Sequence, residues 1–387
     1  MTLRPIVRTA AITLLALPLC AGPVDAQIAV SANDAKVRLV DGVQTIVRNP
    51  PPDTVTIIDL SVSPPKIVAT IQAPTSVVGP PQSVAIAPDR SIALVTAAQK
   101  IDPADPSKTI PDDRVTVIDL TSTPPAVLAT LHAGSAASGV SINRTGTLAL
   151  VANRSDGTVS VFTIRGKTVT AAGKVDLGAP ESGPSHVVFT RDGTAALVSR
   201  NNDSLISVLS VNGAKVENTK HDIASGLKPY GIDVTPAGDV AIVANIGAGL
   251  TGGSDTVSVI DLTATPPRAV DQVAVGAIPE GLAVSPDGGH VALTIMNGSN
   301  AAKSSPTYND FGRLRVFALN RRALTPVAEA KIGHWCQGAA WTSADTLLVQ
   351  CMVEQEILLF RFVGHRLVPA GSIKMPGAPA GIRAVSR

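Results

Sequence analysis

Apolar and polar residues alternate along nearly the whole chain after residue 26, in short runs rich in Val, Ile and Thr. Gly, Asn, Asp and Pro interrupt these runs at close intervals. Alternation with period two, bounded by such turn residues, predicts β-strands. We therefore expect an all-β chain of many short antiparallel strands joined by tight turns.

One unit of this pattern recurs along the chain. It holds a strand, a tight turn and a second strand, as in PSHVVFTRDGTAALVSR (184–200), followed by a third strand and a shorter fourth run. The third strands begin at residues 53, 113, 157, 204, 255, 312 and 355, so the unit repeats every 43 to 60 residues. A period of this length with about four strands predicts a propeller blade. Residues 27–387 are expected to form a single seven-bladed β-propeller of four-stranded antiparallel blades.

The two ends of the chain compete to complete the first blade. The segment AGIRAVSR (380–387) looks like a lone innermost strand, whereas IAVSANDAKVRLV (28–40) resembles a complete hairpin by itself. Pro379, Ala380 and Gly381 match the start of the other blades. We therefore expect the C-terminal strand to close the ring.

The pieces LVAN, IVAN and VSPDG within these repeats are similar to the YVTN-type repeat family of seven-bladed propellers. The similarity extends over essentially all of the chain after residue 26. It implies the propeller fold and an exported bacterial protein, but no particular chemistry. No Trp-Asp dipeptide closes the third strands, which argues against an intracellular WD40 scaffold.

The first 26 residues have the order of a secretory signal peptide. Arg4 and Arg8 precede an apolar run at 9–22, and small residues occupy 24 and 26. Cleavage is expected near Ala26–Gln27, which gives a periplasmic or secreted protein. The apolar run is too short to span a bilayer, and no later run is long enough, so we expect no membrane span. We also expect a monomer.

Charge and loop length narrow the choice of partners. The 32 Lys and Arg residues nearly balance 30 Asp and Glu, so no electrostatic footprint for nucleic acid is present. The loops between second and third strands are long at 41–53, 97–113, 246–255 and 296–312. In a propeller these loops emerge at one end, and long loops on a rigid scaffold commonly carry binding. That end is expected to engage a small molecule or a protein partner.

Four residues that follow the first position of a blade are candidate ligand contacts at this end of the channel. They are Gln82, Tyr230, Glu280 and Gln337. Polar side chains at this position project toward the mouth, where they could contact a ligand or only hold water.

An enzymatic alternative centres on His186. Five of seven blades carry Gly at this position, and a His there is expected to project into the channel. Together with Arg200 and Glu181 it could supply a base, an anion clamp and an acid. The motif GPSH (183–186) resembles the Gly-Pro-x-His pattern of seven-bladed lactonases and cycloisomerases, which implies a lactonase-like hydrolase or isomerase. Those enzymes carry an acidic residue where this chain has Arg200, and a polar channel His that only binds water remains the competing interpretation.

The two cysteines after residue 26 predict a disulfide. Antiparallel pairing about the turn at 343–345 places Cys336 opposite Cys351, and an exported protein meets an oxidising environment. A soft-metal site formed with His334 and Met352 is the alternative. No metal-binding spacing supports it, so we expect neither a metal nor another cofactor.

Overall fold

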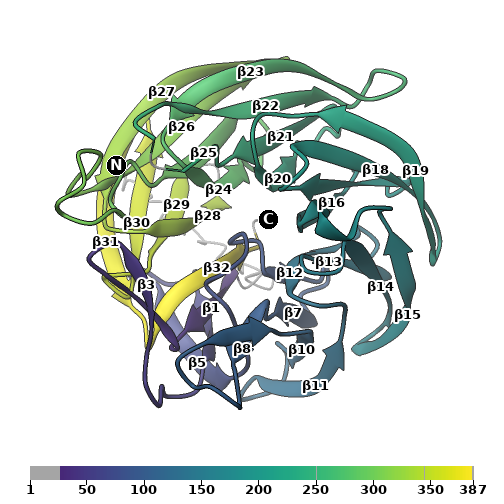
Figure 1. Ribbon diagram of the computed structural model, residues 1–387, viewed down its shortest axis with the longest axis horizontal. Coiled ribbons are helices and arrows are strands. Elements are labelled where there is room, and N and C mark those ends of the chain that lie inside the picture. Colours follow the sequence, from purple (N-terminus) through teal and green to yellow (C-terminus); the bar gives the residue numbers. More distant parts are fainter. Residues whose placement is uncertain (1–26, 250, 344, 386–387) are drawn as a thin grey trace, which may run out of the picture.

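The computed structural model describes residues 27–249, 251–343 and 345–385. The expected signal peptide lies outside these residues. The described chain forms seven four-stranded antiparallel sheets arranged around one axis (Figure 1). This confirms the expected all-β, seven-bladed propeller. Across these ranges, no helix has the length and hydrophobicity to cross a membrane.

In blades two to four, strand order from the axis outward follows the chain. Blade two contains β6 (Val84–Ile86), β7 (Ile92–Thr96), β10 (Arg114–Asp119) and β11 (Ala126–His132). Blade three contains β12 (Ala137–Ile142), β13 (Leu148–Asn153), β14 (Thr158–Arg165) and β15 (Thr168–Asp176). Blade four contains β16 (Pro184–Phe189), β17 (Ala195–Arg200), β18 (Leu205–Asn212) and β19 (Lys215–Ala224), and the 3-10 turn η1 (Pro180–Ser182) precedes it.

Blades five to seven repeat the same order. Blade five contains β20 (Pro229–Val234), β21 (Val240–Asn245), β22 (Asp255–Asp261) and β23 (Arg268–Gly276). Blade six contains β24 (Pro279–Val284), β25 (His290–Ile295), β26 (Gly312–Asn320) and β27 (Ala323–Ile332). Blade seven contains β28 (Cys336–Ser343), β29 (Thr346–Cys351), β30 (Glu356–Val363) and β31 (Arg366–Lys374).

Blade one is built from both ends of the chain, and this closes the ring. Its innermost strand is β32 (Ala378–Ala384), followed outward by β1 (Ile28–Asp34), β4 (Thr54–Asp59) and β5 (Lys66–Gln72). Strands β32 and β1 run antiparallel. The expectation that the C-terminal strand closes the ring is confirmed. The apparent hairpin at 28–40 is divided, because β2 (Val37–Val40) pairs with β3 (Val43–Ile46) instead of with β1.

Apolar side chains of the inner three strands pack between neighbouring blades. Leu148 and Val159 of blade three, for example, share a buried cluster with Val187 and Ala196 of blade four. The innermost strands approach so closely that side chains are excluded at some positions. A Cβ on Gly281 would lie 2.0 Å from the carbonyl oxygen of Gln337 in the next blade. The Gly-rich position of the repeat therefore follows from crowding at the axis.

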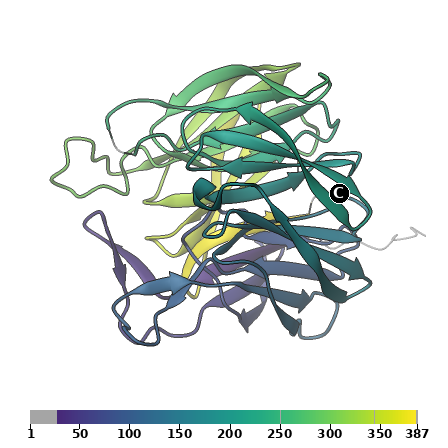
Figure 2. The ribbon, with the colours of Figure 1, turned by 45° about the vertical axis from the view of Figure 1, so that its right-hand side comes forward.

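The long loops are gathered on one side of the ring (Figure 2). Two of them contain hairpins, β2–β3 and the pair β8 (Gln99–Ile101) and β9 (Thr109–Pro111). The β2–β3 hairpin reaches the 296–312 loop, where Asp41 Oδ1 accepts a hydrogen bond from the backbone N–H of Lys303 at 2.8 Å. The loops of blades one and six therefore touch across blade seven.

The connection between β5 and β6 enters the centre of the ring at this same end. In Figure 1 it is visible as the dark-blue loop near the axis. Thr75 and Val77 in this connection are buried, and the Val77 carbonyl oxygen accepts a hydrogen bond from Gln337 Nε2 at 3.4 Å. Lys36 Nζ donates to the Thr75 carbonyl oxygen at 2.6 Å and anchors the connection to blade one. Residues 73–83 therefore cover part of the loop-side mouth of the channel.

Candidate functional site

The four polar residues expected at the rim lie at the loop-side end of the innermost strands. Tyr230, Glu280 and Gln337 are each the second residue of their strand, and Gln82 precedes β6. Gln82, Tyr230 and Gln337 are buried, and Glu280 is partly buried. They are not solvated rim residues, because the β5–β6 connection, to which Gln82 itself belongs, covers this end of the channel and contacts Gln337 through the Val77 carbonyl oxygen. We refer to Tyr230, Glu280 and Gln337 as the mouth cluster.

Several buried oxygens of this region have no hydrogen-bond partner within the described residues. They are Glu280 Oε2 and Gln337 Oε1 of the mouth cluster, Gln82 Oε1, and Ser138 Oγ at the equivalent position of blade three. A buried polar atom without a partner costs about 1–3 kcal/mol, so such atoms are uncommon in folded proteins. All four can accept hydrogen bonds. The arrangement therefore suits a bound molecule that carries several hydrogen-bond donors.

Arg154 adjoins the mouth cluster and was not identified from the sequence. It follows β13, and its Nη1 donates to Ser185 Oγ at 2.5 Å while Nη2 donates to Asn201 Oδ1 at 3.2 Å. Its Cζ lies 5.5 Å from the centre of the Tyr230 ring, within the range of a cation–π contact. A signal for it existed, because Arg154 is charged at a position where blades five and six carry the apolar residues Ile246 and Met296.

The electrostatic environment of the mouth cluster favours a carboxyl group that titrates near neutrality. Burial raises the pKa of Glu280 to about 7, although hydrogen bonding to Gln337 and the positive charge of Arg154 act in the opposite direction. Burial likewise raises the pKa of the Tyr230 hydroxyl, so this group stays protonated. The cluster consequently offers both donors and acceptors at neutral pH.

A cavity of about 340 Å³ lies beside Arg154 on the loop-rich end. Glu181, Asn202 and Gln99 also line it, together with Val78 from the β5–β6 connection. We refer to this cavity as the vestibule. Arg154 faces both the vestibule and Tyr230, so it joins an open cavity to the buried mouth cluster.

The structure does not bring His186, Arg200 and Glu181 together. Arg200 points outward along blade four, where Nη1 donates to Asp222 Oδ2 at 3.0 Å and Nη2 pairs with Asp203. Glu181 is exposed on η1 and lines the vestibule, whose lining includes neither His186 nor Arg200. The positive charge next to Glu181 in this cavity belongs to Arg154.

His186 lies in the wall of the channel. Its ring packs against the backbone of blade three, because a Cβ on Gly139 would lie 2.4 Å from His186 Cδ2. The Nδ1 atom accepts a hydrogen bond from the backbone N–H of Ile232 at 3.2 Å. Burial, with a smaller contribution from the positive charge of Arg383, lowers the pKa of His186 to about 3. The imidazole is therefore neutral at physiological pH and links three blades.

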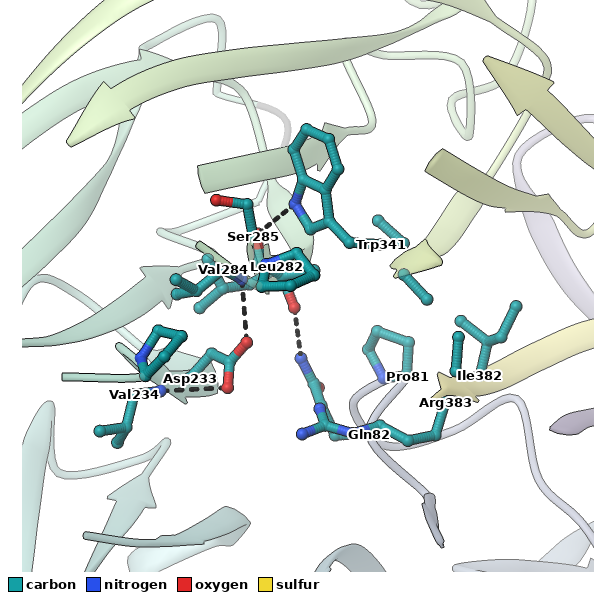
Figure 3. Close-up of a pocket in the computed structure, with 16 residues that line it drawn as sticks. Pro81, Gln82, Asp233, Val234, Leu282, Val284, Ser285, Trp341, Ile382 and Arg383 are labelled. Atoms are coloured by element: carbon teal, nitrogen blue, oxygen red, sulfur yellow. Dashed lines mark hydrogen bonds between the residues drawn. The ribbon is translucent and has the colours of Figure 1, made fainter. Parts of the chain in front are cut away.

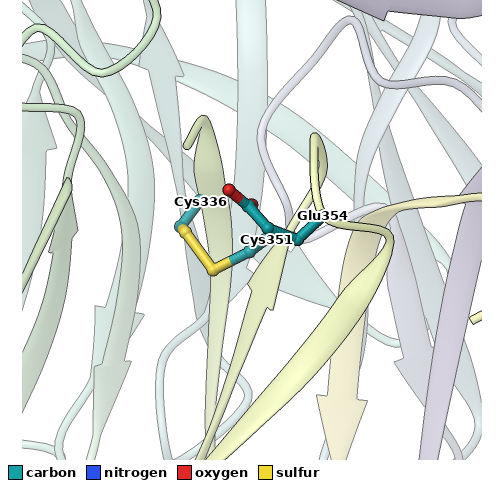
Figure 4. A group of neighbouring side chains, drawn as sticks. All are labelled: Cys336, Cys351 and Glu354. Atoms are coloured by element: carbon teal, nitrogen blue, oxygen red, sulfur yellow. A yellow bond between two sulfur atoms is a disulfide. The ribbon is translucent and has the colours of Figure 1, made fainter. Parts of the chain in front are cut away.

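Cys336 and Cys351 form a disulfide between β28 and β29 (Figure 4). The two residues are paired directly opposite each other, as the antiparallel register predicted. Glu354 lies nearby, and its carboxylate accepts a hydrogen bond from the backbone N–H of His334 at 3.0 Å. Because the sulfur atoms are bonded to each other, they are not thiolates that could ligate a soft metal.

No protein-family model and no curated protein sequence matches the chain. Similarity to solved structures is extensive but distant. The chain is similar to a putative 6-phosphogluconolactonase from Bacteroides fragilis, with 15% identity, a TM-score of 0.71 and coverage of 94% of this chain and 99% of that chain. It is also similar to the periplasmic gluconolactonase PpgL of Pseudomonas aeruginosa, with 15% identity, a TM-score of 0.67 and coverage of 93% and 99%.

A third similar structure is a protein of unknown function from Desulfotomaculum acetoxidans. It shares 16% identity with a TM-score of 0.68, and the alignment covers 93% of this chain and 99% of that chain. At these identities the three structures establish the seven-bladed propeller fold and nothing about chemistry.

Proposed function

We propose that this protein binds a small, uncharged, hydroxyl-rich molecule at the loop-side mouth of its channel. The proposal rests on the unpaired oxygens of Glu280 and Gln337, which are buried beside the positive charge of Arg154. Hydroxyl groups can donate to these oxygens and accept from Arg154. An ordered molecule with several hydroxyls would remove the cost of leaving these atoms without partners.

The charges in the vestibule also support an uncharged ligand. Arg154 and Glu181 have opposite charges and line the same cavity, so neither sign predominates. Two of the five N–H donors of Arg154 are engaged by the neutral oxygens of Ser185 and Asn201, and the remaining donors are open to a ligand hydroxyl. A strongly anionic ligand would compete with Glu181, whereas a sugar or polyol would meet balanced polar surroundings.

The test is a calorimetric titration of the purified protein with a panel of monosaccharides and polyols. Glu280→Gln and Gln337→Met should each weaken binding of the identified ligand at least tenfold. Glu217→Gln and Gln272→Met change the same residue types on exposed outer strands, and they should leave binding unchanged. Lack of any ligand in the panel, or equal affinity in the mouth-cluster variants, would contradict the proposal.

A lactonase-like hydrolase is the alternative. It is supported by the GPSH motif and by two similar structures, a putative 6-phosphogluconolactonase and a gluconolactonase. We favour binding because His186 contacts the backbone of Ile232 and lies apart from Arg200 and Glu181. Hydrolysis of δ-gluconolactone above the spontaneous rate, lost in His186→Asn, would reverse this preference.

The protein is proposed to work outside the cytoplasm. The Cys336–Cys351 disulfide supports this location, because such bonds persist in oxidising compartments. Amino-terminal sequencing of the protein recovered from the periplasm or medium should begin at Gln27. Recovery of the full-length chain only from the cytoplasm would contradict the location and leave the ligand question to the titration.

A further inference from the structure

A second cavity, of about 190 Å³, lies in the channel toward the opposite end of the ring (Figure 3). Its walls come from the innermost strands of blades one, five, six and seven, near the turns that join first and second strands. Apolar groups such as Leu282, Trp341 and Ile382 form part of the lining. Neither Arg154 nor a residue of the mouth cluster belongs to it. We refer to this cavity as the far-side cavity.

Asp233 supplies an oriented carboxylate to the far-side cavity. Its Oδ1 accepts a hydrogen bond from the backbone N–H of Val234 at 3.0 Å, and Oδ2 accepts one from Val284 at 2.9 Å. The two backbone amides come from neighbouring blades and fix the direction of the carboxylate. Each oxygen can accept a further hydrogen bond, because a carboxylate has about four acceptor sites.

Arg383 supplies a positive charge that is not neutralised by a direct contact. It extends from β32 toward Asp233 and Gln82 (Figure 3). Its guanidinium makes no hydrogen bond or ion pair with any residue in the described part of the chain, although its charge influences both Asp233 and His186. Since His186 is neutral, it adds no second positive charge near Arg383. All the donors of Arg383 are therefore open to a ligand.

Gln82 adds an unpaired acceptor to the same cavity. Its Nε2 donates to the Leu282 carbonyl oxygen at 3.5 Å, whereas its Oε1 is buried and has no partner among the described residues. Gln82 therefore lines the far-side cavity and lies between this cavity and the loop-side mouth. The side chain is only 7% exposed, so its orientation is set by its neighbours.

We propose that the far-side cavity binds a free α-amino acid, with the carboxylate on Arg383 and the ammonium between Asp233 and Gln82 Oε1. A zwitterion matches a cation and an anion that share a cavity without contacting each other. The ammonium carries three donors, which suit the remaining acceptor sites of Asp233 and Gln82. A phosphate or dicarboxylate would be repelled by Asp233, and a simple amine would leave Arg383 without a partner. The cavity volume restricts the ligand to small side chains.

The test compares molecules of nearly equal size that differ in one charged group. Titration calorimetry would compare L-alanine with three analogues. In L-lactate a hydroxyl replaces the ammonium, and propionate has neither an ammonium nor a hydroxyl. Isopropylamine keeps the ammonium but has a methyl group in place of the carboxylate. L-Alanine should bind at least tenfold more tightly than any of the other three. L-Tryptophan should not bind, because its side chain exceeds the cavity. Equal affinity for L-alanine and propionate, or no binding of L-alanine, would overturn the proposal.

Two variants distinguish this site from weak general binding. Arg383→Met should reduce L-alanine affinity at least tenfold, and Asp233→Asn should bring the affinities for L-alanine and L-lactate within about twofold. Arg366→Met on the exposed outer strand of blade seven is the matched control. Unchanged binding in Arg383→Met would show that L-alanine binds without this guanidinium and would overturn the proposal. Glu280→Gln should leave L-alanine binding intact, so failure of this proposal and failure at the loop-side mouth are separable.

Discussion

The guanidinium of Arg200 donates a hydrogen bond to the Asp222 carboxylate at 3.0 Å, which joins the second strand of blade four to its outermost strand. The side chain passes Ser207 on the strand between them, and Nη1 also donates to Ser207 Oγ at 3.3 Å. Arg200 is 7% exposed, so its charge is largely removed from water. Asp203 and Asp222 compensate for that loss.

Replacement of this arginine should lower stability and spare ligand binding. Arg200→Met removes hydrogen bonds to two carboxylates and leaves both without their cation, at an expected cost of about 2 kcal/mol in the free energy of unfolding. Urea unfolding at pH 7 measures this change, with Arg366→Met as the exposed control. Loss of ligand binding or catalysis in a variant of unchanged stability would instead assign Arg200 a direct functional role.

The difference between Arg200 and the disulfide shows what strand register can and cannot predict. Antiparallel pairing about a turn places Cys336 opposite Cys351 because the partner of each backbone position depends only on counting residues. The same counting gives the position of Arg200 but not the direction of its long side chain. That direction depends on Asp203 and Asp222, which reach it through a neighbouring loop and an outer strand.

The sequence repeat predicted where the residues of the mouth cluster lie on their strands, but it did not predict that they are buried. The repeat aligns Tyr230, Glu280 and Gln337 because each follows the first residue of an innermost strand. Their burial results from residues 73–83, a connection without periodicity whose path across the channel no hydrophobic pattern reveals. Arg154 was missed for a related reason, since the contact with Tyr230 crosses from blade three to blade five.

The neutral state of His186 should be visible by NMR. Because its pKa is lowered to about 3, the imidazole signals should not change between pH 8 and pH 5. His186→Asn identifies the signals by their disappearance, and its side-chain oxygen can still accept from the Ile232 amide. A transition near pH 6.5 in these signals would contradict the buried, neutral environment.

This shift also makes a contribution to stability that depends on pH. The unfolded chain binds a proton at His186 below about pH 6.5, whereas the folded protein does so only below about pH 3. The contribution to the free energy of unfolding therefore increases as pH rises from 3 to 6.5 and is constant above. At about 1.36 kcal/mol for each pH unit, its upper limit is on the order of 5 kcal/mol. His186→Asn should lack this dependence in urea unfolding measured across the same range.

Removal of the disulfide should destabilise blade seven. The Cys336–Cys351 bond closes a loop with a sequence separation of 15, for which the entropy of the unfolded chain predicts about 3 kcal/mol. Cys336→Ser combined with Cys351→Ser should lower the free energy of unfolding by about this amount. Thiol titration of the denatured protein beginning at Gln27 should find no free thiol before reduction and two after it. Two free thiols before reduction would contradict the bond.

Glu280 should make the loop-side mouth less stable as pH rises through the slightly acidic range. The pKa of its carboxyl is about 7 in the folded protein, against 4.5 as the ordinary value, so between these values the folded state holds a proton that the unfolded state has released. Its contribution to the free energy of unfolding therefore decreases from pH 4.5 to pH 7 and is constant above, by roughly 3 kcal/mol at most. Glu280→Gln replaces the carboxyl group by an amide that does not titrate. The free energy of unfolding of the variant should therefore rise relative to that of the natural protein as pH increases over that interval. Urea unfolding at half-unit pH steps measures the difference, with Glu217→Gln as the exposed control. A difference that is independent of pH would mean that Glu280 titrates alike in the folded and unfolded states.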